Sequence, residues 1–210
     1  MSTFNQHICK IIILSGVTLL LSSCANTKIS QSWVEPNHNK SYNDLLIIGI
    51  GESEQNRRAY ESYFTAELKE HKIESVASYT LIKSNEKMDR DTVVKAIDGL
   101  GIDAVIVTHM IAVDEETVYR TGHSHTGYNR YSRNMYSYYP RVNSYVHRPG
   151  YYTTHETYTF ETSLYDIVTE ELVWTARSRT FSPGAVDEVI VDLTKLLIKD
   201  LKEKNLIKKK

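Results

Sequence analysis

The feature that most constrains the fold is a continuous apolar run, DLLIIGIG, at residues 44–51. A segment that is apolar at every position, rather than at every second one, is typical of a strand buried on both faces of a sheet. Such a strand needs helices to cover it. The next segment supplies one, because four large residues recur at helical spacing on one face: Tyr60, Tyr63, Phe64 and Leu68.

The same alternation continues along the chain. IESVASYT, at residues 73–80, predicts a short strand. Asp91 is expected to cap a helix that ends at Gly99 and Gly101. DAVIVTHMIAVDEETVYR, at residues 103–120, predicts a long strand that is buried at first and alternates later. This order of strands and helices implies an α/β layer with a partly parallel sheet.

The last third of the chain predicts a hairpin followed by a helix. Two alternating strands meet at VTEEL, residues 168–172. Ser182 is expected to cap the final helix, whose first turn is acidic and whose last turn is rich in lysine. The predicted fold is therefore α/β (α+β), a single three-layer-like domain over residues 44–207. Its mixed sheet and helices follow the order β-α-β-α-β, long loop, β-hairpin, α.

The first 23 residues read as a secretory signal peptide. Lys10 precedes the apolar run Ile11 to Leu21, which is too short to cross a bilayer and ends in two serines before Cys24. That ending resembles the bacterial lipobox, in which the cysteine becomes N-terminal and acquires acyl chains such as palmitate. The resemblance implies a lipoprotein with a lipidated Cys24.

The rest of the N-terminal region fits an exported, anchored protein. The only other cysteine is Cys9, inside the predicted signal peptide, so we expect no disulfide in the mature chain. Residues 24–43 are polar and read as a tether between the lipidated cysteine and the domain. Ala25 and Asn26 follow the cysteine where an aspartate would favour the inner membrane. The resemblance thus points to the outer membrane, facing the periplasm.

Four segments carry a wider resemblance: SWVEP, YNDLLIIGIGESEQNRRAYESYF, GIDAVIVTHMIAVDEETVY and SLYDIVTEELVW. Together they resemble a family of uncharacterised bacterial lipoproteins over residues 31–207. The soluble domain of that family is similar to the N-terminal domain of TolB and to CsgG-like envelope proteins. The resemblance implies a fold, an envelope location and a role in assembly or protein interaction. It implies no catalytic residues.

Residues 121–154 form the predicted contact surface. No Asp or Glu occurs from Thr117 to His155, whereas five arginines and most of the tyrosines of the chain fall in or beside this stretch. A long loop in a compact domain is usually functional or disordered, and Tyr and Arg are enriched at protein interfaces. We expect an envelope protein or cell-wall glycan to contact Tyr128, Arg130, Tyr131, Arg133, Tyr136, Tyr138, Tyr139, Arg141, Tyr145, Tyr151 and Tyr152.

Other functions are alternatives. His123 and His125 point to one side of an extended chain and suit Zn, Cu or Ni, with His147 or His155 as a further ligand. The export signal argues against nucleic acid as a partner. The GIGES segment lacks a third glycine and a lysine, so its glycines are expected to serve the turn from strand to helix. No hydrolase motif is present, and a cell-wall enzyme is the remaining alternative to a non-enzymatic binding module.

Overall fold

The computed structural model describes residues 27–83, 86–120 and 151–208. Cys24 and residues 121–150 lie outside them, as do the predictions made for them. The strands are β1 (Thr27–Val34), β2 (Asp44–Ile50), β3 (Glu74–Ala77), β4 (Ala104–Arg120), β5 (Tyr151–Asp166) and β6 (Leu172–Phe181). The helices are α2 (Glu54–Glu70), α3 (Arg90–Ile97), α5 (Val186–Glu203) and a short 3-10 turn, η1 (Ser78–Thr80).

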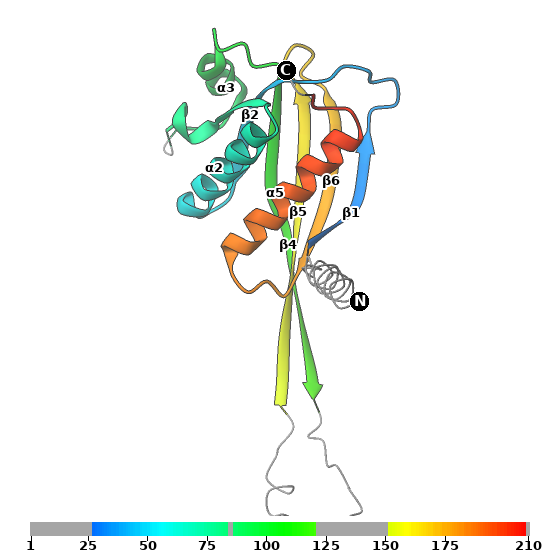
Figure 1. Ribbon diagram of the computed structural model, residues 1–210. Helices are drawn as coiled ribbons and strands as arrows, with labels where there is room; N and C mark the ends of the chain where they lie inside the picture. Colours follow the sequence, from blue (N-terminus) through cyan, green and yellow to red (C-terminus); the bar gives the residue numbers. More distant parts are fainter. Residues whose placement is uncertain (1–26, 84–85, 121–150, 209–210) are drawn as a thin grey trace, which may run out of the picture.

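All six strands form one mixed sheet in the order β1-β6-β5-β4-β2-β3 (Figure 1). β2 is parallel to both of its neighbours, and the other pairs are antiparallel. Helices α2 and α5 lie side by side on one face, while α3 lies on the other face over β2 and β4. The predicted fold class and the hairpin between β5 and β6 are confirmed.

The larger core lies between the sheet and the α2–α5 layer. β2, β4 and β6 contribute alternate side chains, including Leu45, Ile106 and the fully buried Trp174. Phe64 and Leu68 on α2 pack against them, as the helical spacing predicts. Burial of each large apolar side chain stabilises the fold by about 1.5–3 kcal/mol.

A second, smaller core explains why β2 is apolar at consecutive positions. Leu46 and Ile48 point to the face opposite Leu45, where they pack with Ile97 of α3 and Val105 of β4. β2 is thus covered on both faces, as predicted from its sequence. None of the helices in the described part of the chain is both long and apolar enough to cross a membrane.

Two predicted helix caps are wrong by a few residues. Asp89, not Asp91, caps α3, because its side chain accepts a hydrogen bond from the backbone N–H of Thr92. The final helix begins after Ala185, which has no capping side chain. Ser182 lies in the preceding turn with φ 44°. Both predicted caps lie within a few residues of the observed helix starts. Sequence alone seldom decides which of several neighbouring residues begins a helix.

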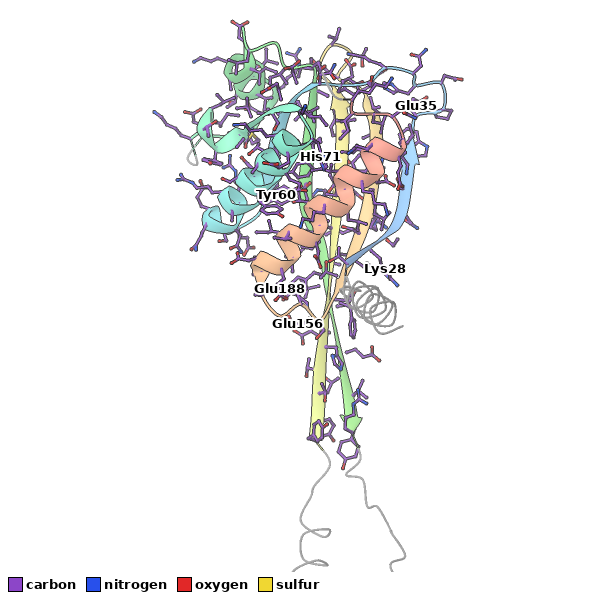
Figure 2. The ribbon with its side chains drawn as sticks, viewed as in Figure 1. Lys28, Glu35, Tyr60, His71, Glu156 and Glu188 are labelled. Atoms are coloured by element: carbon purple, nitrogen blue, oxygen red, sulfur yellow. The ribbon has the colours of Figure 1, made fainter. Side chains whose placement is uncertain are left out.

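The predicted tether is wrong for residues 27–34, which form the edge strand β1. It pairs with β6 from Thr27 opposite Thr180 to Val34 opposite Trp174. β1 is polar because most of its side chains are exposed at the edge of the sheet. Figure 2 shows Lys28 at the lower end of this strand and Glu35 beyond its upper end. Only Ala25 and Asn26 therefore separate Cys24 from the sheet.

Asp166 joins three parts of the fold at the end of β5. Its carboxylate accepts hydrogen bonds from Lys40 Nζ at 2.6 Å and Tyr42 OH at 2.9 Å. It also accepts hydrogen bonds from the backbone N–H groups of Val168 and Thr169 in the β5–β6 turn. Burial by itself would raise the pKa of Asp166, but the hydrogen bonds outweigh it and hold that pKa well below its usual range.

We expect Asp166→Asn to lower the free energy of unfolding at pH 7 by about 2–3 kcal/mol, because it removes charge-assisted hydrogen bonds. A depressed pKa stabilises the fold fully above the ordinary carboxyl pKa, about 3.9, and this contribution declines progressively as the pH falls from there toward the lower pKa of the folded state. Urea titrations at pH 7 and pH 3 test this. The difference between wild type and variant must shrink at pH 3, and a constant difference would contradict the assignment.

Candidate functional site

The most distinctive feature of the described chain is a two-stranded projection from the sheet (Figure 1). β4 and β5 stay paired from Ala104 opposite Asp166 to Arg120 opposite Tyr151. β2 pairs with β4 only as far as His109, and β6 pairs with β5 only as far as Thr157. We call residues 115–120 and 151–156 the ribbon. Six residues per strand carry it roughly 20 Å beyond the body of the sheet.

Aromatic side chains occupy the tip of the ribbon. Tyr119 lies opposite Tyr152, and their ring centroids are 4.9 Å apart. Arg120 pairs with Tyr151 at the last register position. The three tyrosines are 52%, 73% and 63% exposed, in the order Tyr119, Tyr152 and Tyr151. The two tyrosines predicted here, Tyr151 and Tyr152, thus present large amphipathic rings to solvent.

The base of the ribbon is acidic. Glu115 lies directly opposite Glu156, and Asp114 and Glu116 flank it on β4. Like charges at opposed positions of a sheet are destabilising. Tyr158 donates a hydrogen bond from its hydroxyl to Glu156, and this bond raises the pKa of Tyr158. The ribbon therefore separates an acidic base from a tip made of tyrosine and arginine.

His155 is the one predicted metal ligand that the described chain contains. Its ring stacks on Phe181 with centroids 5.2 Å apart, and its Nδ1 lies 3.4 Å from the Ser182 hydroxyl. No group of three or more His, Cys, Asp or Glu residues within the described ranges is placed to hold a metal ion. His123, His125 and His147 lie outside those ranges, so the metal site stays a prediction.

The remaining predicted site residues also lie outside the described ranges. They are Cys24 and nine candidate contact residues: Tyr128, Arg130, Tyr131, Arg133, Tyr136, Tyr138, Tyr139, Arg141 and Tyr145. What the structure shows is the position from which their segment departs. Both ends of the segment, Arg120 and Tyr151, meet at the tip of the ribbon.

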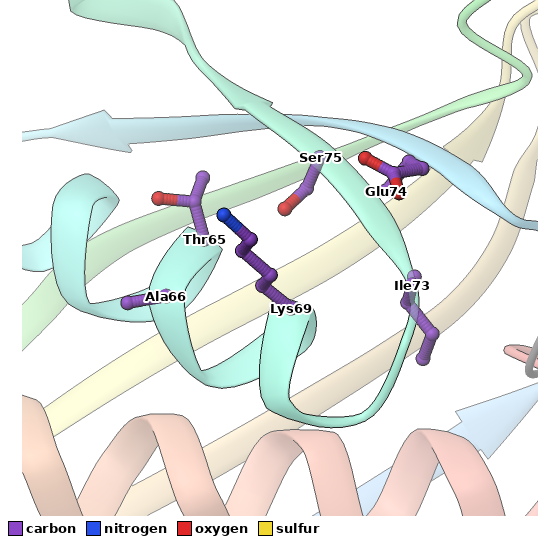
Figure 3. Close-up of a pocket in the computed structure, with 6 residues that line it drawn as sticks. All are labelled: Thr65, Ala66, Lys69, Ile73, Glu74 and Ser75. Carbon is purple, nitrogen blue, oxygen red and sulfur yellow. The ribbon is translucent and has the colours of Figure 1, made fainter.

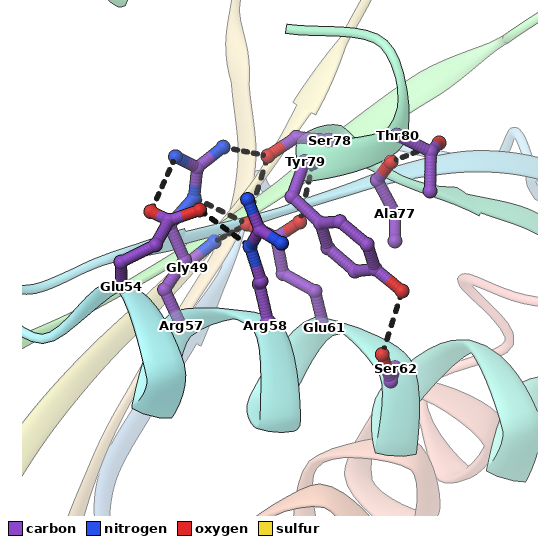
Figure 4. A network of polar contacts seen from close by, with 10 residues as sticks. All are labelled: Gly49, Glu54, Arg57, Arg58, Glu61, Ser62, Ala77, Ser78, Tyr79 and Thr80. Carbon is purple, nitrogen blue, oxygen red and sulfur yellow. Dashed lines mark hydrogen bonds and ion pairs between the residues drawn. The ribbon is translucent and has the colours of Figure 1, made fainter. Parts of the chain in front are cut away.

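A buried polar network occupies the carboxyl ends of β2 and β3 (Figure 4). Ligands of open α/β sheets often bind at such a position. Here Glu61, which is fully buried, accepts hydrogen bonds from the Gly49 N–H, Arg57 Nε, the Ser78 hydroxyl and the Tyr79 N–H at 2.8–3.0 Å. These hydrogen bonds join α2 to β2 and to η1, which directly follows β3.

Gly49 is the first glycine of GIGES, and it lies where α2 passes close to β2. A Cβ atom at this position would lie 3.1 Å from Cδ1 of Tyr60, which is closer than ordinary packing allows. The hydroxyl of Tyr60 lies 2.6 Å from the Thr108 hydroxyl, which fixes the ring in place. Gly49 therefore serves the close approach of α2 to β2 from within the strand, and not the turn from strand to helix that the sequence predicted.

The hairpin from Asp166 to Trp174, quoted above for the resemblance, has a structural role at both ends. Trp174 is fully buried, and its Nε1 donates hydrogen bonds to Asp200 Oδ2 at 2.9 Å and to the Ser32 hydroxyl at 3.2 Å. The indole thus links β6 to both α5 and β1. Asp166 fastens the turn at the other end. Sequence reasoning singled out this hairpin without finding these partners.

Two hollows of the described surface lie beside α2. One of about 290 Å³ lies between α2 and the edge strand β3, lined by Thr65, Ala66, Lys69, Ile73, Glu74 and Ser75 (Figure 3). Another, of about 350 Å³, lies between α2 and α5 near His71 and Lys202. Neither hollow contains the ribbon or the Glu61 network, and their charged groups are Lys, Glu and His side chains on or next to α2, β3 and α5.

Comparisons with known proteins give distant structural likenesses. No family model matches the sequence, and no curated protein matches it. Two structures of the PelC dodecamer from Paraburkholderia phytofirmans are 11% and 12% identical, with a TM-score of 0.45 for each. Each likeness covers 88% of this chain and 99% of the PelC chain.

Lipoprotein GNA1162 from Neisseria meningitidis is 12% identical, with a TM-score of 0.40, over 76% of this chain and 98% of its own. Likenesses at this level establish neither a family nor a function for the chain. The relation to TolB and CsgG-like domains stays a prediction.

Proposed function

We propose that this chain is a lipid-anchored protein of the bacterial envelope that acts as a non-enzymatic binding or assembly module. Its anchor is Cys24, most simply in the outer membrane and facing the periplasm. Its contact surface comprises the tip of the ribbon and the segment that the tip carries, residues 121–154. The partner is an envelope protein or cell-wall glycan.

The ribbon is the observation that carries this proposal. Two strands of the sheet continue past their neighbours for no gain in core packing, since most side chains of the ribbon are exposed. The cross-strand pair Glu115–Glu156 even disfavours the ribbon. The ribbon thus lowers the stability of the fold and ends in the exposed side chains of Tyr119, Tyr151 and Tyr152. A role in presenting a contact surface accounts for both properties.

The anchor is tested with Cys24→Ser. The wild-type chain should fractionate with membranes, and its N-terminal peptide should carry acyl groups in mass spectrometry. A single acyl chain binds membranes only marginally, whereas several chains hold a protein in place. The Cys24→Ser variant should therefore lose the acyl groups and leave the washed membrane fraction. A wild-type peptide without acyl groups would contradict the anchor.

The contact surface is tested by replacing residues 121–150 with Asn-Gly. This dipeptide closes a tight hairpin, so the variant keeps the ribbon and its tyrosines but lacks the segment. Cross-linking in intact cells, followed by mass spectrometry, compares the two proteins. We expect the wild-type chain to capture a partner that the variant does not. Capture of the same partners by both would show that residues 121–150 are not needed for contact.

A further inference from the structure

The direction of β1 determines where the N-terminal anchor lies relative to the ribbon. β1 is antiparallel to β6, and β6 is antiparallel to β5, so β1 and β5 run the same way. β5 runs from the tip of the ribbon into the body. The chain that precedes Thr27 therefore approaches β1 from the side of the sheet on which the ribbon projects.

The register gives the level of Thr27 along the ribbon axis. Thr27 pairs with Thr180, which in turn pairs with Tyr158, two residues from the ribbon base. The hydroxyls of Thr27 and Thr180 lie 3.0 Å apart, which ties the start of β1 to this level. Figure 2 shows Lys28 and Glu156 at the same end of the body, with Glu35 at the opposite end.

Two lengths then determine how far the tip of the ribbon extends beyond the reach of Cys24. Ala25 and Asn26 separate Cys24 from Thr27, and three peptide units span at most roughly 11 Å. The seven residue-to-residue steps from Tyr158 to Tyr151 extend the tip roughly 23 Å beyond the level of Thr27. The tip therefore projects on the order of 12 Å past the farthest point that Cys24 can reach in that direction.

When the ribbon points toward the bilayer that holds the acyl chains of Cys24, the ribbon must meet that bilayer. With the ribbon upright, its tip enters the headgroup region. With the ribbon tilted, it lies along the surface. The two-residue link leaves too little chain to lift the tip away from the membrane unless the whole body turns over.

The chemistry of the ribbon suits this position. Tyrosine is enriched at membrane interfaces, where its ring meets the acyl boundary and its hydroxyl meets water. Arg120 at the tip can donate hydrogen bonds to lipid phosphates. The carboxylates of Glu115, Glu116 and Glu156 stand at the base, near the level that the anchor can reach. With the ribbon upright, these anionic groups lie farther from the bilayer centre than the tyrosines and Arg120 of the tip.

We propose that Tyr119, Arg120, Tyr151 and Tyr152 form a membrane-docking tip that contacts lipid headgroups of the bilayer in which Cys24 is anchored. This inference rests on the proposed acylation of Cys24. It places the contact surface of the protein at the membrane, and of the two partner classes proposed above it favours an envelope protein at the bilayer over cell-wall glycan.

Spin labels on two single-cysteine variants test the docking. The thiol of Cys24 is blocked once acylated, so Tyr152→Cys labels the tip and Val168→Cys labels the opposite end, in the β5–β6 turn, where the side chain is 81% exposed. The acylated full-length chains are reconstituted into vesicles of phosphatidylethanolamine and phosphatidylglycerol. Collision rates with oxygen and with a water-soluble nickel complex are then measured by electron paramagnetic resonance.

We expect reconstitution to lower the nickel collision rate at position 152 several-fold and to raise the oxygen rate there, with no change at position 168. Equal access to nickel at both positions in an acylated sample would overturn the docking while leaving the lipid anchor intact. A fall in both rates at position 152 would indicate burial against a second copy and would also contradict it. If mass spectrometry of the sample finds no acyl group on Cys24, the anchor and the docking fall together.

Discussion

Glu61→Ala should lower the free energy of unfolding by about 3–5 kcal/mol, because it removes one partner of a buried ion pair. The glutamate side chain is fully buried and that of Arg57 is 10% exposed, with 3.0 Å between Arg57 Nε and Glu61 Oε1. The substitution also leaves the backbone N–H groups of Gly49 and Tyr79 without their acceptor. Since whole domains are stable by only about 5–15 kcal/mol, this loss is a large share.

Glu67→Ala is the matched control on the same helix. Glu67 lies 3.9 Å from the imidazole of His71, and both side chains reach solvent. Exposed pairs of this kind contribute about 0–1 kcal/mol. Urea unfolding followed by far-ultraviolet circular dichroism should therefore separate the two variants clearly. Similar midpoints for Glu61→Ala and Glu67→Ala would show that the network does not hold α2 to the sheet.

Trp174→Ala should be comparably damaging, with an expected loss of about 3–5 kcal/mol, because it opens a large cavity in the core between β6 and α5. The indole is fully buried and lies in the same cluster as Leu197 and Leu201. Its Nε1 also supplies hydrogen bonds to Ser32 and Asp200. The substitution should loosen β1, β6 and α5 together.

Two further variants separate these effects. Trp174→Phe keeps most of the buried volume while it removes the Nε1 donor, so it should cost about 1–3 kcal/mol. Trp33→Ala removes the other tryptophan, which is 42% exposed on the edge strand, and its cost should stay well below that of Trp174→Ala. Urea titrations of all three test this order. A loss for Trp33→Ala as large as that for Trp174→Ala would contradict the assigned core.

The sequence predicts well those elements whose burial is uniform along their length. β2 is apolar at consecutive positions because α2 and α3 cover opposite faces of the sheet around it. α2 has a clear apolar face because only one side of it contacts the core. β1 escapes prediction because it is an edge strand. Its backbone pairs with β6 while most of its side chains remain in solvent, so polar residues suffice.

The candidate site is less visible in the sequence. The run of tyrosines and arginines marks residues 121–154, but nothing in it reveals that β4 and β5 carry this segment well beyond the sheet. That length depends on where β2 and β6 stop pairing, which is a property of the assembled sheet. The shortness of the link between Cys24 and the sheet is likewise a property of the assembled sheet. It follows only from the observation that β1 begins at Thr27.

The most direct measurement of the central claim is photo-crosslinking in intact cells from single positions. Benzoylphenylalanine replaces Tyr152 at the tip in one protein and Val168 at the opposite end in another. We expect position 152 to form adducts with envelope lipid or protein, and position 168 to form none of those adducts. Identical adducts from both positions, or adducts from position 168 alone, would contradict a contact surface at the ribbon.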